Sequence, residues 1–99
     1  MTELLKYLDE TGWSDLNPWP GFPAQRMIEK EGWRYQWLIQ SPGHAQLVRS
    51  RKKGDTMEIE AFVALEESRC LYWARKLKEG IQPESPEPDP KSGMKVAFL

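Results

Sequence analysis

Few side chains in this sequence are of the types that carry out covalent chemistry. It contains one cysteine, Cys70, and one histidine, His44. Cys70 falls on the apolar stripe of an expected helix, where a buried thiol is usually unreactive, and His44 falls on the far face of an expected sheet. One cysteine and one histidine are too few for a zinc site of the ordinary kind. We therefore expect neither a nucleophilic cysteine nor a bound metal.

Two carboxylates alternate along one expected strand. Glu58 and Glu60 would share a face of that strand, ~6.6 Å apart along it, which is within the reach of an acid–base pair. Alternating glutamates on an open sheet face are also the ordinary pattern of a solvated surface, and the sequence has no glycine-rich motif for binding phosphate. We expect no enzymatic activity and no cofactor.

Basic residues concentrate in the middle of the chain. Residues 33–57 contain five basic side chains and one acidic one, although the whole chain has a formal net charge of −1. Lysines at a hairpin tip can reach phosphates, and arginine or glutamine side chains on a sheet can contact base edges. The hypothesis of a nucleic-acid-binding module assigns the interface to Arg34, Gln36, Gln46, Arg49, Arg51, Lys52 and Lys53.

Three other features favour contact with another protein, which is the function that we expect first. A proline-rich loop carries aromatic residues, an otherwise polar sheet face carries an apolar strip, and the last six residues are largely apolar. Aromatic side chains are enriched where proteins meet. The expected function is a small regulator or inhibitor that occupies a partner surface, and a homodimer or accessory subunit is a further hypothesis. The residues assigned to this contact are Trp19, Phe22, Leu38, Val48, Phe62, Phe98 and Leu99.

Local patterns predict three helices around the central region. Leucines at helical spacing predict a first helix over 2–11, and a proline-rich loop follows over 14–23. Pro23 suits the first position of a second helix over 23–31. A longer helix over 64–79 carries an apolar stripe that would cover one face of a sheet.

Alternation of apolar and polar residues predicts a three-stranded antiparallel meander over 33–40, 44–51 and 55–62. We expect Gln40 to lie opposite His44 and Arg51 to lie opposite Asp55, because a slip of one residue would mix apolar and polar side chains. This register gives the covered face Trp33, Tyr35, Trp37, Ile39, Ala45, Leu47, Met57, Ile59 and Ala61, with Arg49 and Arg51 beside its aromatic rings.

The expected fold class is α+β, with the order α-α-β-β-β-α and the last helix packed on one sheet face. Three antiparallel strands backed by a helix resemble the sheet-reading DNA-binding domains of some recombinases, and the order α-β-β-β-α resembles double-stranded-RNA-binding domains. Both resemblances are of topology. Glu66 and Glu67 stand where the second family carries lysines, and they would repel phosphate.

A chain of 99 residues makes one domain at most. We expect a globular domain over 1–81, a disordered Pro/Glu-rich tether over 82–93, and an apolar peptide over 94–99 that either forms an edge strand or binds another protein. One cysteine excludes an intramolecular disulfide, and no apolar run approaches ~20 residues. With no signal peptide recognised, the expected protein is soluble, cytoplasmic and not membrane-bound.

Overall fold

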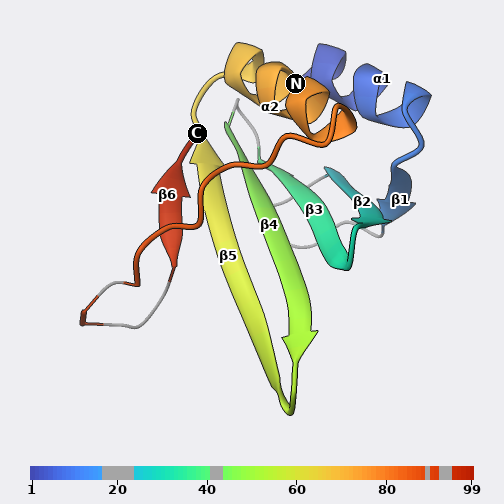
Figure 1. Cartoon of the computed structure of the whole chain (residues 1–99). Coiled ribbons are helices and arrows are strands. Elements are labelled where there is room, and N and C mark those ends of the chain that lie inside the picture. The colour runs from blue at the N-terminus through green and yellow to red at the C-terminus, as the bar shows by residue number, and fades with distance from the viewer. Residues whose placement is uncertain (17–23, 41–43, 89, 92–94) are drawn as a thin grey trace.

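The computed structural model describes residues 1–16, 24–40, 44–88, 90–91 and 95–99. It is an α+β structure in which two helices pack together against one face of a six-stranded sheet (Figure 1). The expected fold class is therefore confirmed, and the expected three strands are the centre of a larger sheet. The elements are α1 (Thr2–Glu10), β1 (Ser14–Leu16), β2 (Ala24–Lys30), β3 (Trp33–Gln40), β4 (His44–Lys53), β5 (Thr56–Ala64), α2 (Glu67–Lys78) and β6 (Val96–Phe98).

The sheet follows chain order, β1-β2-β3-β4-β5-β6. Strands β1 to β5 are antiparallel neighbours, and β6 returns to lie parallel to β5. We call the face that the two helices cover the helical face and the opposite one the open face. None of the helices in the described part of the chain combines the length and apolar character needed to cross a membrane.

The expected helix over 23–31 is wrong, because this segment forms strand β2. Ala24, Met27 and Ile28 fit a helical stripe, but Met27 lies on the open face while Ala24 and Ile28 lie on the helical face. Glu31 and Gly32 follow with φ of 55° and 83°, as in the two-residue type I′ turns that join antiparallel strands. Gly32 therefore lies in a hairpin turn, where a helix over 23–31 would have ended.

The register between β4 and β5 also differs from the expected one. Arg51 lies opposite Glu58, and the loop has two residues with Gly54 first, at φ 63°, as in type II′ hairpins. The slip is three residues, an odd number, so it exchanges the two faces of β5. This register buries Phe62, which is 1% exposed, in the core. The pairing of Gln40 with His44 between β3 and β4 is confirmed.

The core lies between the helices and the helical face of the sheet. Alternation in β3 points its aromatic side chains inward, and Trp37 is completely buried. Helix α2 begins at Glu67 rather than at 64, because β5 continues to Ala64. The buried cluster comprises Leu4, Leu8, Trp13, Trp33, Tyr35, Trp37, Ile39, Ala45, Leu47, Phe62, Ala64, Cys70, Ala74 and Leu77.

The segment after α2, residues 81–88, crosses the helical face of the sheet, and we call it the strap (Figure 1). Pro83 is buried, and the side chains of Gln82 and Ser85 both accept hydrogen bonds from Arg49 on β4. The expectation of a disordered tether is wrong for these residues, since a partner far away in sequence holds them. Of the two alternatives for 94–99, the edge strand is the one observed, as β6.

Candidate functional site

The residues assigned to nucleic-acid binding do not form one surface. Arg49 and Arg51 lie on the helical face, whereas Arg34, Gln36, Gln46 and Lys52 lie on the open face and Lys53 is at the hairpin end. Arg49 is 3% exposed and therefore inaccessible to a ligand. Gln36 Nε2 donates to Gln25 Oε1 at 2.7 Å. Among the residues assigned to this interface, the exposed basic ones are Arg34, Arg51, Lys52 and Lys53.

A network of ion pairs occupies the helical face where we expected arginines beside aromatic rings. Arg49 Nε donates to Glu60 Oε1 at 2.7 Å, and the Arg49 guanidinium lies 4.7 Å from the ring centroid of Trp33. Arg51 lies 4.1 Å from the same ring and donates to Glu58 Oε2 at 3.0 Å. The cation–π contacts with Trp33 are confirmed.

The two alternating glutamates of β5 belong to this network of ion pairs. Glu58 and Glu60 lie on the helical face and not on the open face, because of the three-residue slip in β5. Each pairs with an arginine, and the hydrogen bond from Arg51 lowers the pKa of Glu58. Glu60 is completely buried under the strap, with Ser85 Oγ at 3.4 Å from its Oε1. The arrangement fixes structure and offers a substrate no path to the buried carboxylate.

The residues assigned to protein binding are also divided by the structure. Leu38, on the open face, is 8% exposed, Val48 is half-buried there, and Phe62 lies on the helical face in the core. Phe98 is 74% exposed, and Leu99 is half-buried. The expected strip of Leu38, Val48 and Phe62 is therefore wrong as a set. Trp19 and Phe22 lie outside the described residues.

A different apolar strip is exposed on the open face, along the two last strands of the sheet. Met57, Ile59, Val96 and Phe98 are 58%, 55%, 44% and 74% exposed. Pairing places Val96 beside Ala61 and Phe98 beside Val63, so all four side chains project from the same face. From residue 57 to residue 63 the strand rises ~20 Å. We call these four residues the β5–β6 strip.

Sequence reasoning found Phe98 but missed the other three members of the strip. In β5, both alternating sets contain apolar residues: Met57 and Ile59 in one, Phe62 in the other. The alternation alone therefore does not say which set is buried. The ion pairs determine which set is buried, because the observed register places Glu58 and Glu60 opposite Arg51 and Arg49.

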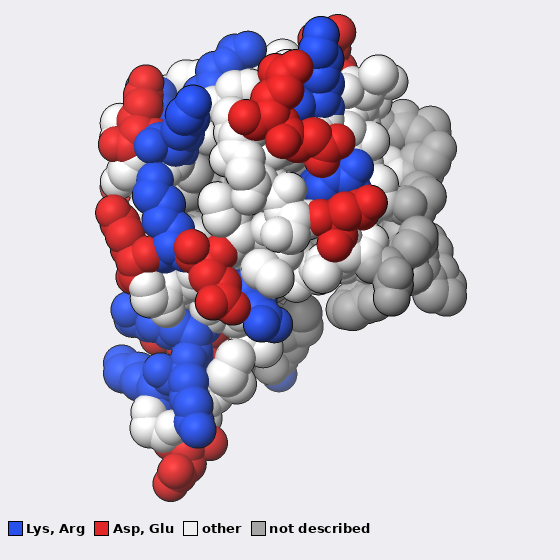
Figure 2. Space-filling model, turned by 90° about the vertical axis from the view of Figure 1, so that its right-hand side faces the viewer, with Lys and Arg blue, Asp and Glu red and all other residues white. Residues whose placement is uncertain are grey.

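The β4–β5 hairpin extends beyond the rest of the sheet (Figure 1). The last β3–β4 pair is Arg34 with Ser50, so residues 51–58 form a two-stranded ribbon without a neighbour in β3. Lysine and arginine side chains gather on this projection, with acidic side chains at its end (Figure 2). Lys52 lies directly opposite Met57, which places a basic side chain beside the end of the β5–β6 strip.

Strand β6 is the edge of the sheet on this side. Just before it, Lys95 makes an isolated bridge to Pro88, and the three residues of β6 pair only with β5 within the described chain. An edge strand presents unpaired backbone donors and acceptors that can pair with another extended chain. Apolar side chains, an edge and a basic projection are thus adjacent.

Within the described ranges, no three histidine, cysteine or acidic side chains lie close enough together to hold a metal ion. Comparison of the chain with protein-family models, with curated proteins and with solved structures gave no match.

Proposed function

We propose that this protein binds another protein through the β5–β6 strip and acts as a small regulator or inhibitor by occupying part of the partner's surface. One observation carries the proposal: four large apolar side chains, each at least 44% exposed, project together from two neighbouring strands. Single exposed apolar residues are ordinary on protein surfaces, whereas a contiguous group of them is typical of a binding site.

The surroundings of the strip indicate the chemistry of the partner. Strand β6 offers an edge for backbone hydrogen bonds, so the partner contributes an extended segment that lies beside it. Phe98 and Val96 would receive the apolar side chains of that segment. Lys52 and Lys53 at the other end of the strip favour acidic residues flanking it. The partner is therefore a protein with an extended, apolar and acid-flanked segment.

A matched pair of variants tests this proposal. Ile59→Asp places a charge within the strip, and Leu65→Asp places the same charge at a site outside it. The two side chains are similarly exposed, at 55% and 60%, so neither change empties the core. The tagged proteins are incubated with nuclease-treated native lysate, and the partner captured by the wild type is quantified and then titrated in purified form.

We expect Ile59→Asp to abolish stoichiometric capture and Leu65→Asp to retain it. Circular dichroism and tryptophan fluorescence establish that both variants fold. A partner that both variants bind as the wild type does, or that both lose equally, would contradict the assignment of the strip. Phe98→Ser serves as a second variant, since a residue that is 74% exposed contributes little to folding.

The projecting hairpin favours a second candidate function, binding to nucleic acid. A two-stranded ribbon fits the major groove of DNA, and Lys52 and Lys53 are both exposed on it. Under this hypothesis Lys52→Glu/Lys53→Glu reduces the magnitude of the negative slope of log K against log salt by about two, whereas the same charge change in Lys6→Glu/Arg69→Glu leaves the slope unchanged. Fluorescence anisotropy with a labelled duplex measures the slope. Equal slopes for the wild type and the hairpin variant would eliminate the ribbon as the site.

A further inference from the structure

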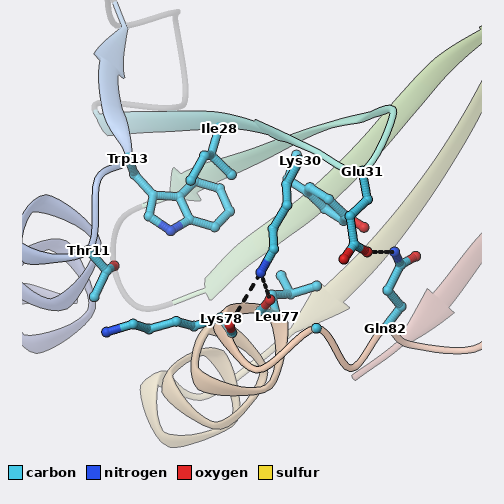
Figure 3. Close-up of a pocket in the computed structure, with 10 residues that line it drawn as sticks. Thr11, Trp13, Ile28, Lys30, Glu31, Leu77, Lys78 and Gln82 are labelled. Carbon is cyan, nitrogen blue, oxygen red and sulfur yellow. Dashed lines mark hydrogen bonds between the residues drawn. The ribbon is translucent and has the colours of Figure 1, made fainter.

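A pocket of about 190 Å³ lies on the side of the molecule away from the β5–β6 strip. It opens where three elements distant in sequence meet: the connection from α1 to β1, the β2–β3 turn and the C-terminal end of α2 (Figure 3). It belongs to neither the strip nor the projecting hairpin, so its chemistry can be considered independently of the proposed function.

The walls of this pocket are apolar and built by the core. Trp13, Tyr35 and Leu77 are 9%, 2% and 5% exposed, and Ile28 closes the side formed by β2. Because these side chains are fixed by packing, the pocket is preformed. Its volume compares with the 150 Å³ cavity known to accept benzene, so it can hold a single aromatic ring or a branched aliphatic group.

The polar groups around the opening are mainly donors. The indole nitrogen of Trp13 lies on the ring edge that faces α2 and Lys78 (Figure 3), and it has no hydrogen-bond partner among the described residues. The ammonium of Lys78 is exposed and likewise has no ion-pair partner in the described ranges. Both donors border the opening, where the acceptor group of a ligand would lie.

The other charged groups of the pocket are already engaged. Lys30 Nζ donates to the backbone oxygens of Leu77 and Lys78 at 2.8 and 3.2 Å, which satisfies carbonyls at the end of α2. Glu31, on the far side of Lys30, accepts from Gln82 Nε2 at 3.5 Å (Figure 3). The charged side chains that line the pocket are thus two lysines, Lys30 and Lys78, and one glutamate, Glu31, and this excess of one positive charge favours an anion.

We propose that this pocket binds a small monocarboxylate whose apolar body is a single aromatic ring or a branched aliphatic chain. The body occupies the space between Trp13, Ile28, Tyr35 and Leu77. The carboxylate remains at the opening, where it accepts a hydrogen bond from the Trp13 indole and pairs with Lys78. Pockets of this kind, apolar with a few convergent polar groups, are the usual form of small-molecule sites.

Titration with sodium benzoate, at constant ionic strength maintained with sodium chloride, tests the proposal on the full chain. Two-dimensional NMR resolves the indole N–H signals, and Trp13→Phe assigns the one from Trp13. We expect benzoate to shift the Trp13 indole signal saturably. Benzyl alcohol, which has the same ring without the charge, binds more weakly.

Two substitutions in the last turns of α2 serve as variant and control. Lys78→Gln raises the Kd for benzoate about two- to fivefold, the effect of one exposed ion pair, and leaves the Kd for benzyl alcohol unchanged. Lys76→Gln, at a lysine that pairs with Glu79 outside the pocket, changes neither Kd. Ile28→Phe fills the apolar space and abolishes both.

Any of three results would overturn the proposal. The first is a Trp13 indole signal that does not move with benzoate, and the second is a signal that moves equally with chloride. The third is equal affinity for benzoate in Lys78→Gln and Lys76→Gln. The two lysine variants keep the test decisive if Ile28→Phe does not fold. The β5–β6 strip and the pocket share no residue, so benzoate binding is tested independently of partner binding through the strip.

Discussion

Replacing either member of the buried Arg49–Glu60 pair with an apolar residue leaves the other charge without a counter-ion. Arg49 is 3% exposed and Glu60 is completely buried. The guanidinium donates to Glu60 at 2.7 Å, and to Gln82 and Ser85 of the strap at 2.9 Å each. It therefore joins β4, β5 and the strap, and we expect its loss to weaken all three.

The magnitude follows from these contacts. Removing one partner of a buried ion pair destabilises a protein by ~3–5 kcal/mol, so Arg49→Met and Glu60→Leu together sum to roughly 6–10 kcal/mol if they act independently. Replacing both residues leaves no unpaired charge. The double variant then loses mainly the hydrogen bonds to Gln82 and Ser85, at about 1 kcal/mol each, for a total of ~2 kcal/mol. The two substitutions are thus strongly non-additive.

Urea denaturation, followed by tryptophan fluorescence, gives the free energy of unfolding for the four proteins of this double-mutant cycle. Limited proteolysis within 81–88 reports separately on the strap, and we expect faster cleavage in every variant that lacks Arg49. The pair of Arg51 and Glu58, two positions along the same strands, is the control. Its side chains are 42% and 18% exposed, so its coupling should be much smaller.

Two results would refute this reasoning. If each single substitution lowers the free energy of unfolding by less than about 1 kcal/mol, the pair is not effectively desolvated. If the two substitutions are additive, the ion pair does not couple the strands. The total free energy of unfolding of a domain is only about 5–15 kcal/mol, so a single substitution could unfold this one. A single variant that does not fold, together with a double variant that does, would therefore also support the expected coupling.

Three further predictions concern the core, a turn and the acid range of pH. Burial raises the pKa of the Cys70 thiol to about 11, so we expect Ellman's reagent at pH 8 to react only after unfolding, and rapid reaction in the native protein would contradict it. Gly32→Ala, at φ 83° in the β2–β3 turn, should lower the free energy of unfolding by roughly 1 kcal/mol, measured by urea denaturation. The hydrogen bond from Arg51 lowers the pKa of Glu58 below its ordinary 4.5, so its stabilising contribution is present above that pH and is lost as pH falls through the lowered pKa. Stability measured against pH should therefore fall less steeply in acid for Glu58→Gln than for the wild type, and identical profiles would contradict this.

The sequence correctly predicted those elements in which the spacing of apolar residues fits only one type of secondary structure. In β3 the set Trp33, Tyr35, Trp37 and Ile39 alternates with mostly polar residues, so the strand and its buried face follow directly. Helix α1 follows equally from leucines at helical spacing. Segment 24–30 satisfies both a helical and a strand pattern, and its pairing with β3 decided the outcome.

The candidate site was less predictable because it depends on distant contacts. The choice between two apolar sets in β5 rests on Glu60 reaching Arg49, a contact that local alternation does not reveal. The strap has the proline-rich, acidic composition typical of disorder, yet Gln82 and Ser85 reach the same arginine. The contacts of one buried side chain, Arg49, thus account both for the β4–β5 register and for the ordered strap, neither of which was predicted.

The strap also determines which surface is left for a partner. By crossing the helical face it covers Arg49 and Glu60, while the β5–β6 strip on the open face stays exposed. A change that frees the strap would expose charged and aromatic groups of the helical face without altering the register that presents Met57 and Ile59. Arg49→Met/Glu60→Leu should therefore retain binding of a partner through the strip, provided that it folds. Ile59→Asp should lose that binding while the strap stays as resistant to proteolysis as in the wild type. This pair of opposite outcomes separates the role of the buried ion pair in folding from the role of the strip in recognition.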